Sequence, residues 1–333
     1  GAATAAGGVS VTFRVTDNVT GTFAERTFSI VGAVILYVFS SPFTFTNAGK
    51  SGRLGPSLTE LQNSSTGYGT SGTTAWVGNS NYLNVTNQGI QQWTVPQTGT
   101  YRIQAFGAGC NGGIAYGANI QGDFTLTNGE IIHIVAGQVG STRKGGGGGS
   151  FVVRTPYNTD ASILVIAGGA GGDGNGANGA GHGQTANSGG NGAGDGFGDG
   201  VGGASGSGGG NAGQNWAGAG GGGFDGDGVS SRAGGNPNAN SEGRKFKPSG
   251  YAVGGLTGGQ YPGGDGGFGG GGAASWASAG GGGYSGGGGV ASTGSGASSS
   301  YSAGGGGSYN NGTSVYEASG ANAGAGFVII TKL

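Results

Sequence analysis

The sequence predicts an all-β protein in which a sandwich of antiparallel strands carries a large glycine-rich insertion. Short segments in which apolar and polar residues alternate are separated by turn residues, and no helical crossovers lie between them. In addition, 61 of the 92 glycines fall within residues 168–312. The expected organisation is an N-terminal β piece over residues 1–40, a sandwich over 41–167 and 320–333, and the insertion over 168–319.

The N-terminal piece is predicted to be a hairpin. Residues 9–15 alternate apolar and polar side chains, a turn follows, and residues 23–30 return as a second strand. The segment VTDNVTGTFAERTF resembles the last hairpin of an immunoglobulin-like or cadherin-like repeat. Two strands cannot bury a core alone, so we expect this piece to pack on the next module, a neighbouring chain or upstream sequence. The apolar stretch 30–39 is too short to span a bilayer and is predicted to be β.

The sandwich is predicted from strands that flank turn residues. Pro56 is well placed to open a short helix that carries Leu58 and Leu61. Asn128-Gly129 predicts a hairpin, because this pair is the strongest two-residue hairpin signal. The predicted strands cover residues 43–45, 82–85, 101–105, 124–126, 131–136, 151–154, 163–166 and 327–331.

The two strands that flank the glycine-rich stretch bear on how it is inserted. Residues 163–166 precede the stretch and residues 327–331 follow it. If these strands are neighbours in one sheet, the ends of the insertion already meet, and closing so long a loop adds little free energy.

Three hypotheses compete for the glycine-rich stretch. Its composition is typical of disorder, but charged residues make up only 8% of the chain, whereas disordered segments are usually charge-rich. Collagen requires a strict three-residue glycine period and abundant proline, and only seven prolines occur. The third hypothesis is a bundle of extended polyglycine helices with three residues per turn, whose backbones approach closely because they lack Cβ atoms.

Such a bundle is expected to need a conventional core as its frame. Ordering a residue costs about 1–2 kcal/mol, while a hydrogen bond returns about 0.5–1.5 kcal/mol net. A bulky residue at Gly282 or Gly287 is expected to force neighbouring helices apart. A larger residue at Ser285 is expected to be tolerated if that side chain points outward.

Composition excludes several functional classes. The net charge is −1, so we expect no nucleic-acid partner, and no segment is long enough for a membrane span. The single Cys110 permits no disulfide within one chain. His133 is expected to be a half-exposed strand residue and His182 a loop residue, and no catalytic set can be argued from them. The sequence therefore predicts a protein that is not an enzyme and has no cofactor.

Calcium is the one metal for which weak candidates exist. Four aspartates between glycines offer oxygen donors, but they match neither an EF-hand nor a glycine-rich calcium repeat. These candidates are Asp195, Asp199, Asp225 and Asp227.

Several motifs resemble known glycine-rich proteins. The segments WTVPQTGTYRIQAFGAGCNG, GEIIHIVAGQVG, GGGGGSFVV, ILVIAGGAGG, GGGGYSGGGG and GGGGSYNNG occur in the order seen in the glycine-rich domain of the anaplastic lymphoma kinase and leukocyte tyrosine kinase receptors. This resemblance implies a tumour-necrosis-factor-like jelly roll with polyglycine helices inserted between its strands. FTFTNAGKSGRLGPSL and NQGIQQWTVP look more like glycine-rich tail-fibre proteins of marine bacteriophages.

These resemblances predict an extracellular binding or structural protein. The leading hypothesis is a phage tail-fibre adhesin whose partner is a cell-surface glycan or protein receptor. The alternatives are a subunit of a secreted or cell-surface filament, which contacts other subunits and forms a homo-oligomer, and a receptor ectodomain that binds a protein ligand.

The candidate contact surface is the longest interruption of the glycine runs, residues 230–253. Four of the thirteen basic residues fall there, so the segment is either a solvated loop or a surface that binds an anionic glycan or lipid head group while aromatic rings stack on a sugar. Its candidates are Arg232, Arg244, Lys245, Phe246, Lys247 and Tyr251. Further candidates are Trp216, Tyr261 and Trp276.

Overall fold

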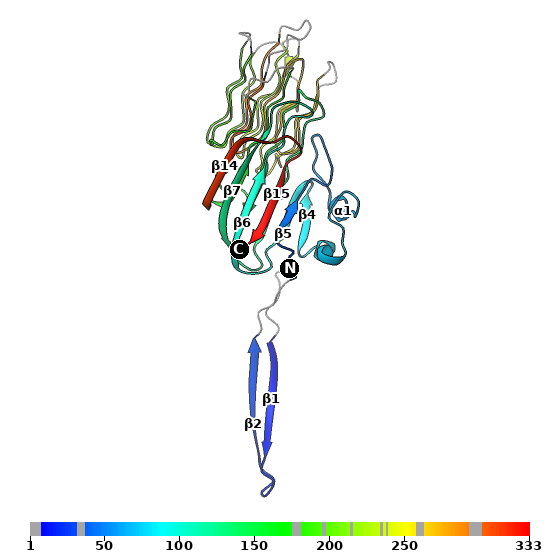
Figure 1. Cartoon of the computed structure of the whole chain (residues 1–333), viewed down its shortest axis with the longest axis vertical. Helices are drawn as coiled ribbons and strands as arrows, with labels where there is room; N and C mark the ends of the chain where they lie inside the picture. The colour runs from blue at the N-terminus through cyan, green and yellow to red at the C-terminus, as the bar shows by residue number, and fades with distance from the viewer. Residues whose placement is uncertain are drawn as a thin grey trace.

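The computed structural model comprises a hairpin, a two-sheet body and a glycine-rich block, arranged in this order along the long axis (Figure 1). It describes residues 8–31, 37–174, 181–194, 198–213, 216–233, 236–237, 239–257, 263–292 and 302–333. Within these ranges, the backbone alone is described at residues 8–11, 28–31, 232–233 and 236–237.

The body consists of two antiparallel sheets, which confirms the all-β prediction. The five-stranded sheet has the order β14 (Thr313–Asn322), β7 (Gly117–Leu126), β6 (Gly99–Phe106), β15 (Phe327–Lys332) and β3 (Phe43–Phe45). The six-stranded sheet has the order β13 (Tyr309–Asn310), β10 (Ile163–Ala167), β9 (Ser150–Arg154), β8 (Ile131–Val135), β5 (Ile90–Thr94) and β4 (Leu83–Asn87).

Short helical turns lie in the loops of the body. They are α1 (Leu58–Gln62), η1 (Gly72–Gly78) and η2 (Asp160–Ser162). Helix α1 begins where Pro56 predicted a helix start. Ser57 caps it, because the Ser57 side chain accepts from the Glu60 amide while the Glu60 carboxylate accepts from the Ser57 amide.

The sheets share one apolar core between their inner faces. Alternate residues of β6 point into it, so Tyr101, Ile103 and Ala105 are fully buried. The facing strands contribute Trp93, Ile134 and other apolar residues of the same cluster. The period-2 pattern of the sequence therefore predicted the buried face of β6 correctly.

The predicted hairpin at Asn128-Gly129 is wrong. Strand β7 pairs with β6 and β14, whereas β8 pairs with β5 and β9 in the other sheet. Gly129 still supplies a left-handed turn, with φ of 79°. The turn carries the chain from the five-stranded sheet, where β7 pairs, to the six-stranded sheet, where β8 pairs.

The ends of the glycine-rich block meet, but not through the strands that the sequence suggested. β10 and β15 lie in different sheets. Instead β10 pairs with β13, where Ile166 faces Tyr309 and Val165 faces Asn310. Both β13 and β14 begin before residue 320, so the chain returns to the sheets earlier than expected.

The glycine-rich block is held by hydrogen bonds between the backbones of separate segments. Most of its described residues lie outside helices and strands, as expected. Residues 218–224 show the pattern, because their amides donate in turn to residues 284–290, 270–273 and 226–229. Every third amide donates to the same neighbour. The donors to residues 284–290 are Gly218, Gly221 and Phe224, at 2.9, 2.9 and 2.8 Å.

Close backbone contact leaves no room for a side chain at many positions inside this block. A Cβ atom added to Gly282 would lie 2.0 Å from the Gly269 carbonyl oxygen, and one added to Gly287 would lie 2.0 Å from that of Gly304. Carbon and oxygen atoms cannot approach so closely without displacing a backbone. The glycine content is therefore a packing requirement at these positions.

The block is anchored to the body by a second apolar cluster on the outer face of the six-stranded sheet. Phe151 of β9 belongs to it, as do Phe224, Phe246, Phe268 and Tyr284 of the block. These four side chains interrupt the glycine runs and face the sheet. The cluster thus joins a block without a core of its own to a conventional sandwich.

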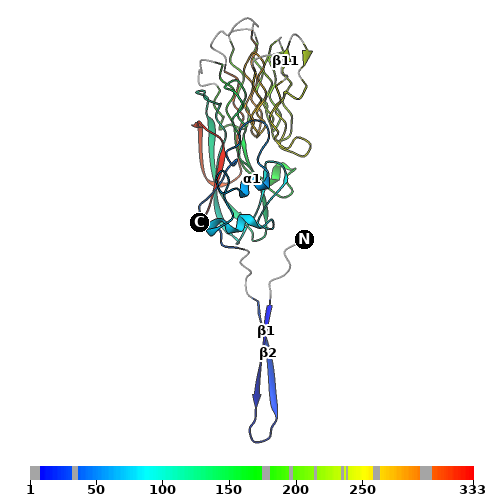
Figure 2. The same cartoon turned by 90° about the vertical axis from the view of Figure 1, so that its right-hand side faces the viewer.

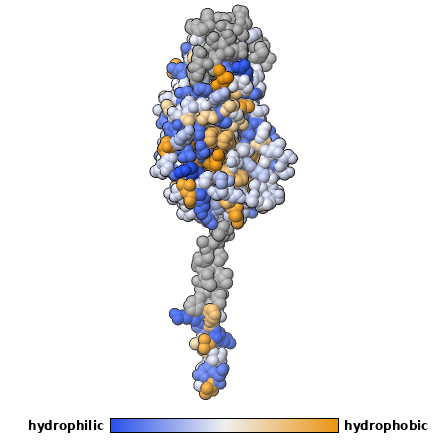
Figure 3. Space-filling view, in the orientation of Figure 1, coloured by the Kyte–Doolittle hydropathy of each residue, from blue (hydrophilic) through white to orange (hydrophobic). Residues whose placement is uncertain are grey.

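The N-terminal hairpin projects away from the body (Figures 1 and 2). Its strands β1 (Gly8–Thr16) and β2 (Phe23–Val31) pair in register over nine residues each. Among the side chains described, Phe13 is 60% and Val15 72% exposed. Figure 3 shows hydrophobic and hydrophilic residues on this thin element. Among the described residues, no strand of the body pairs with this hairpin.

Ser285 does not meet the condition under which a larger residue was expected to be tolerated, because its side chain does not point outward. Its side chain is fully buried, and its hydroxyl accepts from the Gly206 amide at 3.1 Å. The serine fits because a small hydroxyl can satisfy a backbone amide inside the block.

Replacing Gly282 by Ala is expected to destabilise the protein by about 1–3 kcal/mol, because the new methyl group overlaps a neighbouring carbonyl. Thermal denaturation measures the change. Gly324→Ala is the matched control, since a Cβ there meets nothing within 4 Å. Equal melting temperatures for the two variants would contradict close backbone packing.

Replacing Ile103 by Asp is expected to make the glycine-rich block cleavable by protease, because an unpaired charge in the shared core disrupts the body that anchors the block. The control is Ile131→Asp, at a residue that is 42% exposed. Cleavage sites are identified by mass spectrometry. A resistant block in a disrupted sandwich would show that the two parts are independent.

Candidate functional site

The basic segment 230–253 runs between the far end of the block and the body. Its strands β11 (Arg232–Ala233) and β12 (Asn236–Pro237) pair with each other, and β11 lies at the end away from the hairpin (Figure 2). Residues near 246 instead lie against the six-stranded sheet. The segment is therefore not a single exposed loop.

Two of its predicted contact residues already have ionic partners. Arg244 pairs with Glu242 at 2.6 Å and with Asp227 at 3.5 Å. Lys247 pairs with Asp225 and, at 3.4 Å, with Asp160 of η2. Lys247 therefore links the block to the body, so its charge has a structural use.

Phe246 is not available for stacking on a ligand, which corrects the prediction for this residue. It is fully buried between two other rings. Its centroid lies 4.8 Å from that of Phe151 and 5.4 Å from that of Phe224, with nearly parallel planes. Phe246 is buried because of its position on the sheet, which the sequence alone does not indicate.

The remaining predicted residues are dispersed. Lys245 is partly exposed, and within the described chain no ion pair involves its side chain. Tyr251 is partly buried against the outer-face cluster. The Arg232 side chain and all of Tyr261 lie outside the described residues.

The fold brings Trp216 and Trp276 together, although neither a motif nor their spacing in the sequence indicated this. Their rings meet edge to face with centroids 6.4 Å apart, and both are partly exposed. The Trp276 carbonyl accepts from Lys144 Nζ at 2.8 Å. This pair remains a candidate contact for a ligand.

The aspartates proposed as weak calcium ligands have other partners. Asp199 accepts from the Gly194 amide at 2.6 Å, and Asp227 accepts from the Lys245 amide at 2.8 Å. Asp225 pairs with Lys247, and Asp195 lies outside the described residues. In the part of the chain that the structure describes, no three acidic, histidine or cysteine side chains form a group able to hold a metal.

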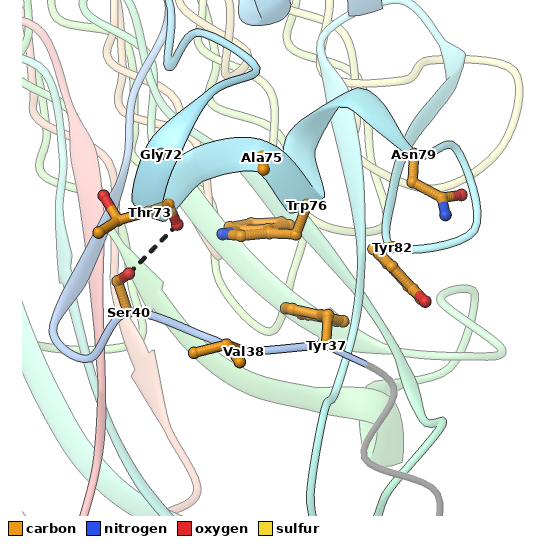
Figure 4. Close-up of a pocket in the computed structure, with 9 residues that line it drawn as sticks. All are labelled: Tyr37, Val38, Ser40, Gly72, Thr73, Ala75, Trp76, Asn79 and Tyr82. Carbon is orange, nitrogen blue, oxygen red and sulfur yellow. Dashed lines mark hydrogen bonds between the residues drawn. The ribbon is translucent and has the colours of Figure 1, made fainter.

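A pocket that the sequence did not predict lies between the start of the body and η1 (Figure 4). We call it the aromatic pocket. Its volume is about 540 Å³. Its lining residues are Tyr37, Val38, Ser40, Gly72, Thr73, Ala75, Trp76, Asn79 and Tyr82.

Three rings shape the aromatic pocket. Tyr37 stacks on Trp76 with centroids 5.1 Å apart and an interplanar angle of 19°, and its other close neighbour is Tyr82 at 4.5 Å. The Tyr37 hydroxyl donates to the Thr94 carbonyl at 2.6 Å, which fixes the ring. Only the fold joins residues so distant in sequence, so no local motif could have indicated the pocket.

The polar groups of the aromatic pocket are uncharged. The Ser40 hydroxyl donates to the Thr73 carbonyl at 3.2 Å, and the exposed Asn79 side chain lies at the rim (Figure 4). Trp76 is 5% exposed, and its Nε1 has no hydrogen-bond partner within the described structure. Leaving such a donor unpaired costs about 1–3 kcal/mol.

A second hollow, of about 360 Å³, lies beside His133, Tyr157 and Pro248. His133 is 3% exposed, which corrects the expectation of a half-exposed side chain. Its Nε2 lies 3.0 Å from the Thr155 hydroxyl, and burial lowers the pKa of His133 to about 4. The imidazole is therefore neutral at pH 7. His182 is partly buried, and its Nδ1 accepts from the Tyr116 amide at 2.9 Å.

Comparison with known proteins shows a partial likeness to a kinase receptor. A region of 112 residues is 36% identical to the leukocyte tyrosine kinase receptor of Mus musculus. The match covers 32% of this chain and 12% of the receptor, so the chain spans a small part of that relative. No family model matches the sequence. These findings support a receptor-like glycine-rich region and no finer relationship.

The described residues include no helix that is both apolar and long enough to cross a membrane.

Stability is expected to fall as the pH drops from about 6.5 to about 4, in part because of His133. In this window the unfolded imidazole binds a proton that the buried one does not, so protons favour the unfolded state. The contribution of His133 reaches at most about 3 kcal/mol. Denaturant titrations at several pH values measure it.

His133→Gln is expected to flatten this part of the pH profile, whereas His182→Gln is expected to retain it. An unchanged profile for the first variant would show that other groups cause the acid sensitivity.

Proposed function

We propose that the glycine-rich segments are polyglycine II helices and that the two sheets form a tumour-necrosis-factor-like jelly roll. The amides of residues 218–224 donate in turn to three neighbouring segments, and this three-residue period supports the first part. The two antiparallel sheets around one core, and the partial likeness to a kinase receptor, support the second.

On this scaffold, the chain serves as a non-enzymatic extracellular binding protein, and its most favoured form is a phage tail-fibre adhesin that recognises a host cell surface. The observation that carries this proposal is the network of hydrogen bonds between the backbones of the block, which we call the lattice. Many of its interior positions have no room for a side chain, as at Gly282 and Gly287, so variable contacts are concentrated at its margins and loops. Such a block is suited to presenting a contact surface at a fixed distance from the body.

The hairpin is the attachment end in this proposal. An isolated two-stranded hairpin is marginally stable in water. One side of this hairpin bears the Thr12–Thr27 and Arg14–Glu25 hydrogen bonds, and the opposite side bears Phe13 and Val15. A second β-sheet with an apolar face would cover Phe13 and Val15 and complete a sandwich.

Two alternative functions use the same features differently. A filament subunit would use the hairpin to join further copies along an axis. A receptor ectodomain is suggested by the partial match to a kinase receptor, which covers only 12% of that protein.

Immunogold labelling of the native particle tests these functions. Label at the tips of virion fibres, together with inhibition of phage adsorption by the purified chain, is expected for an adhesin. Label along the length of a free filament, or on a cell surface without effect on adsorption, would contradict it.

A variant pair then locates the contact surface. Lys245→Ser is expected to weaken cell adsorption, most strongly at low salt, because this lysine has no ionic partner in the described chain and its charge is free to meet an anionic surface. Lys50→Ser is the control, since Lys50 pairs with Glu60 at 2.6 Å on the body. Equal adsorption of the two variants would exclude Lys245 from the contact surface.

A further inference from the structure

We propose that the aromatic pocket binds a neutral saccharide. The pocket is formed by residues between Tyr37 and Tyr82 and contains no residue of the glycine-rich block. It is thus a second site, separate from the block margins, and it stands or falls independently of the adhesin hypothesis.

The walls of the pocket select a ligand with an apolar face. Tyr37 contacts both Trp76 and Tyr82, so three rings form this wall. Tyr37 and Trp76 are only 9% and 5% exposed, and the partly exposed Tyr82 therefore offers the main open ring surface. Aromatic rings supply broad, rigid apolar surface at low entropic cost. The C–H face of a pyranose matches such a surface. A volume of about 540 Å³ is within the range of small-molecule sites and accommodates a single sugar ring with its substituents.

The polar groups select a ligand that is uncharged and both donates and accepts hydrogen bonds. None of the nine lining residues is charged, so nothing in the pocket offsets the desolvation of an ionic group. The Asn79 amide offers donors and an acceptor, and the Ser40 hydroxyl retains lone pairs while it donates to Thr73. A saccharide hydroxyl is a donor and an acceptor in one group, and therefore fits this set.

Trp76 is the residue that gives the pocket a polar anchor. Its buried Nε1 lacks an acceptor, and Figure 4 shows the nitrogen edge of the indole on the side of Ser40 and Thr73. The Ser40–Thr73 hydrogen bond beside it is exposed and long, at 3.2 Å. An entering hydroxyl can accept from Trp76 Nε1 and donate to a lone pair of Ser40 Oγ, which keeps its own hydrogen bond to the Thr73 carbonyl. The unpaired donor of the free protein then becomes satisfied in the complex.

Saturation-transfer NMR of the full chain tests the proposal. The probes are methyl α-D-glucopyranoside, methyl α-D-mannopyranoside and methyl β-D-galactopyranoside, each with a titration to obtain Kd. Transfer to at least one saccharide is expected. Trp76→Phe keeps a ring but removes the N–H, and is expected to raise Kd about fivefold, as for the loss of one hydrogen bond. Asn79→Ala, at an exposed rim position, is expected to raise Kd. Asn79 Oδ1 also accepts from the Asn81 amide at 3.0 Å, so thermal denaturation checks that the loss of this local bond leaves the fold intact.

Tyr316→Phe is the control, because it removes a polar hydrogen from an exposed ring of β14 that does not line the pocket. Its Kd is expected to equal that of the parent chain. Thermal denaturation of each variant confirms folding.

Three outcomes would overturn the proposal. The first is the absence of transfer to all three saccharides. The second is saccharide binding that neither Trp76→Phe nor Asn79→Ala weakens, which would place the sugar elsewhere. The third is tighter binding of N-acetyl-leucine amide than of any saccharide, which would identify the pocket as a site for an apolar peptide. Absence of saccharide binding by the parent chain, with cell adsorption intact, would refute this site and leave the proposed function standing.

Discussion

Close approach of one backbone to another is the constraint on which the glycine-rich block depends. Residues 218–224 donate hydrogen bonds in three directions, so each direction is occupied by another backbone. A methyl group at Gly221 would lie 2.0 Å from the Gly281 carbonyl oxygen. The segment can therefore have side chains only where a Cβ atom does not meet a neighbouring backbone, as at Ala219 and Phe224. The Phe224 ring packs in the cluster on the outer face of the six-stranded sheet.

The same constraint makes the block dependent on the body. Each ordered glycine loses more conformational entropy than any other residue, and hydrogen bonds offset only part of that loss. Apolar burial has to supply the difference, and it does so at Phe246, Phe268 and Tyr284. Phe268 lies over Gly89, where a Cβ would be 2.2 Å from its ring. Gly89 of the body and Phe268 of the block thus pack closely together. The Lys247–Asp160 pair lies beside the same sheet.

Local patterns in the sequence predicted what local physics determines. Alternation identified the strands, Pro56 marked the start of α1, and glycine runs marked the lattice. Pairing between distant strands was not predictable in this way, because Asn128-Gly129 specifies a turn but not the partners of the strands beside it. The outcome for Phe246 was not predictable for the same reason. A basic segment with Phe246 has the composition of a contact surface, yet its ring is buried under neighbours that only the fold supplies. Conversely, Trp76 lies in no motif and becomes notable only beside Tyr37.

Two kinds of surface follow from this architecture, and they differ in what they can recognise. In the lattice, many interior positions exclude side chains, so a contact surface there is assembled from loops and from pairs such as Trp216 and Trp276 at the margins. In the body, side chains pack in the ordinary way and can line a pocket, as they do around Trp76. A pocket desolvates the part of a ligand that enters it and gives weight to single hydrogen bonds, whereas loops offer breadth and tolerance to substitution. A small neutral ligand is therefore better matched to the body, and a large surface to the block.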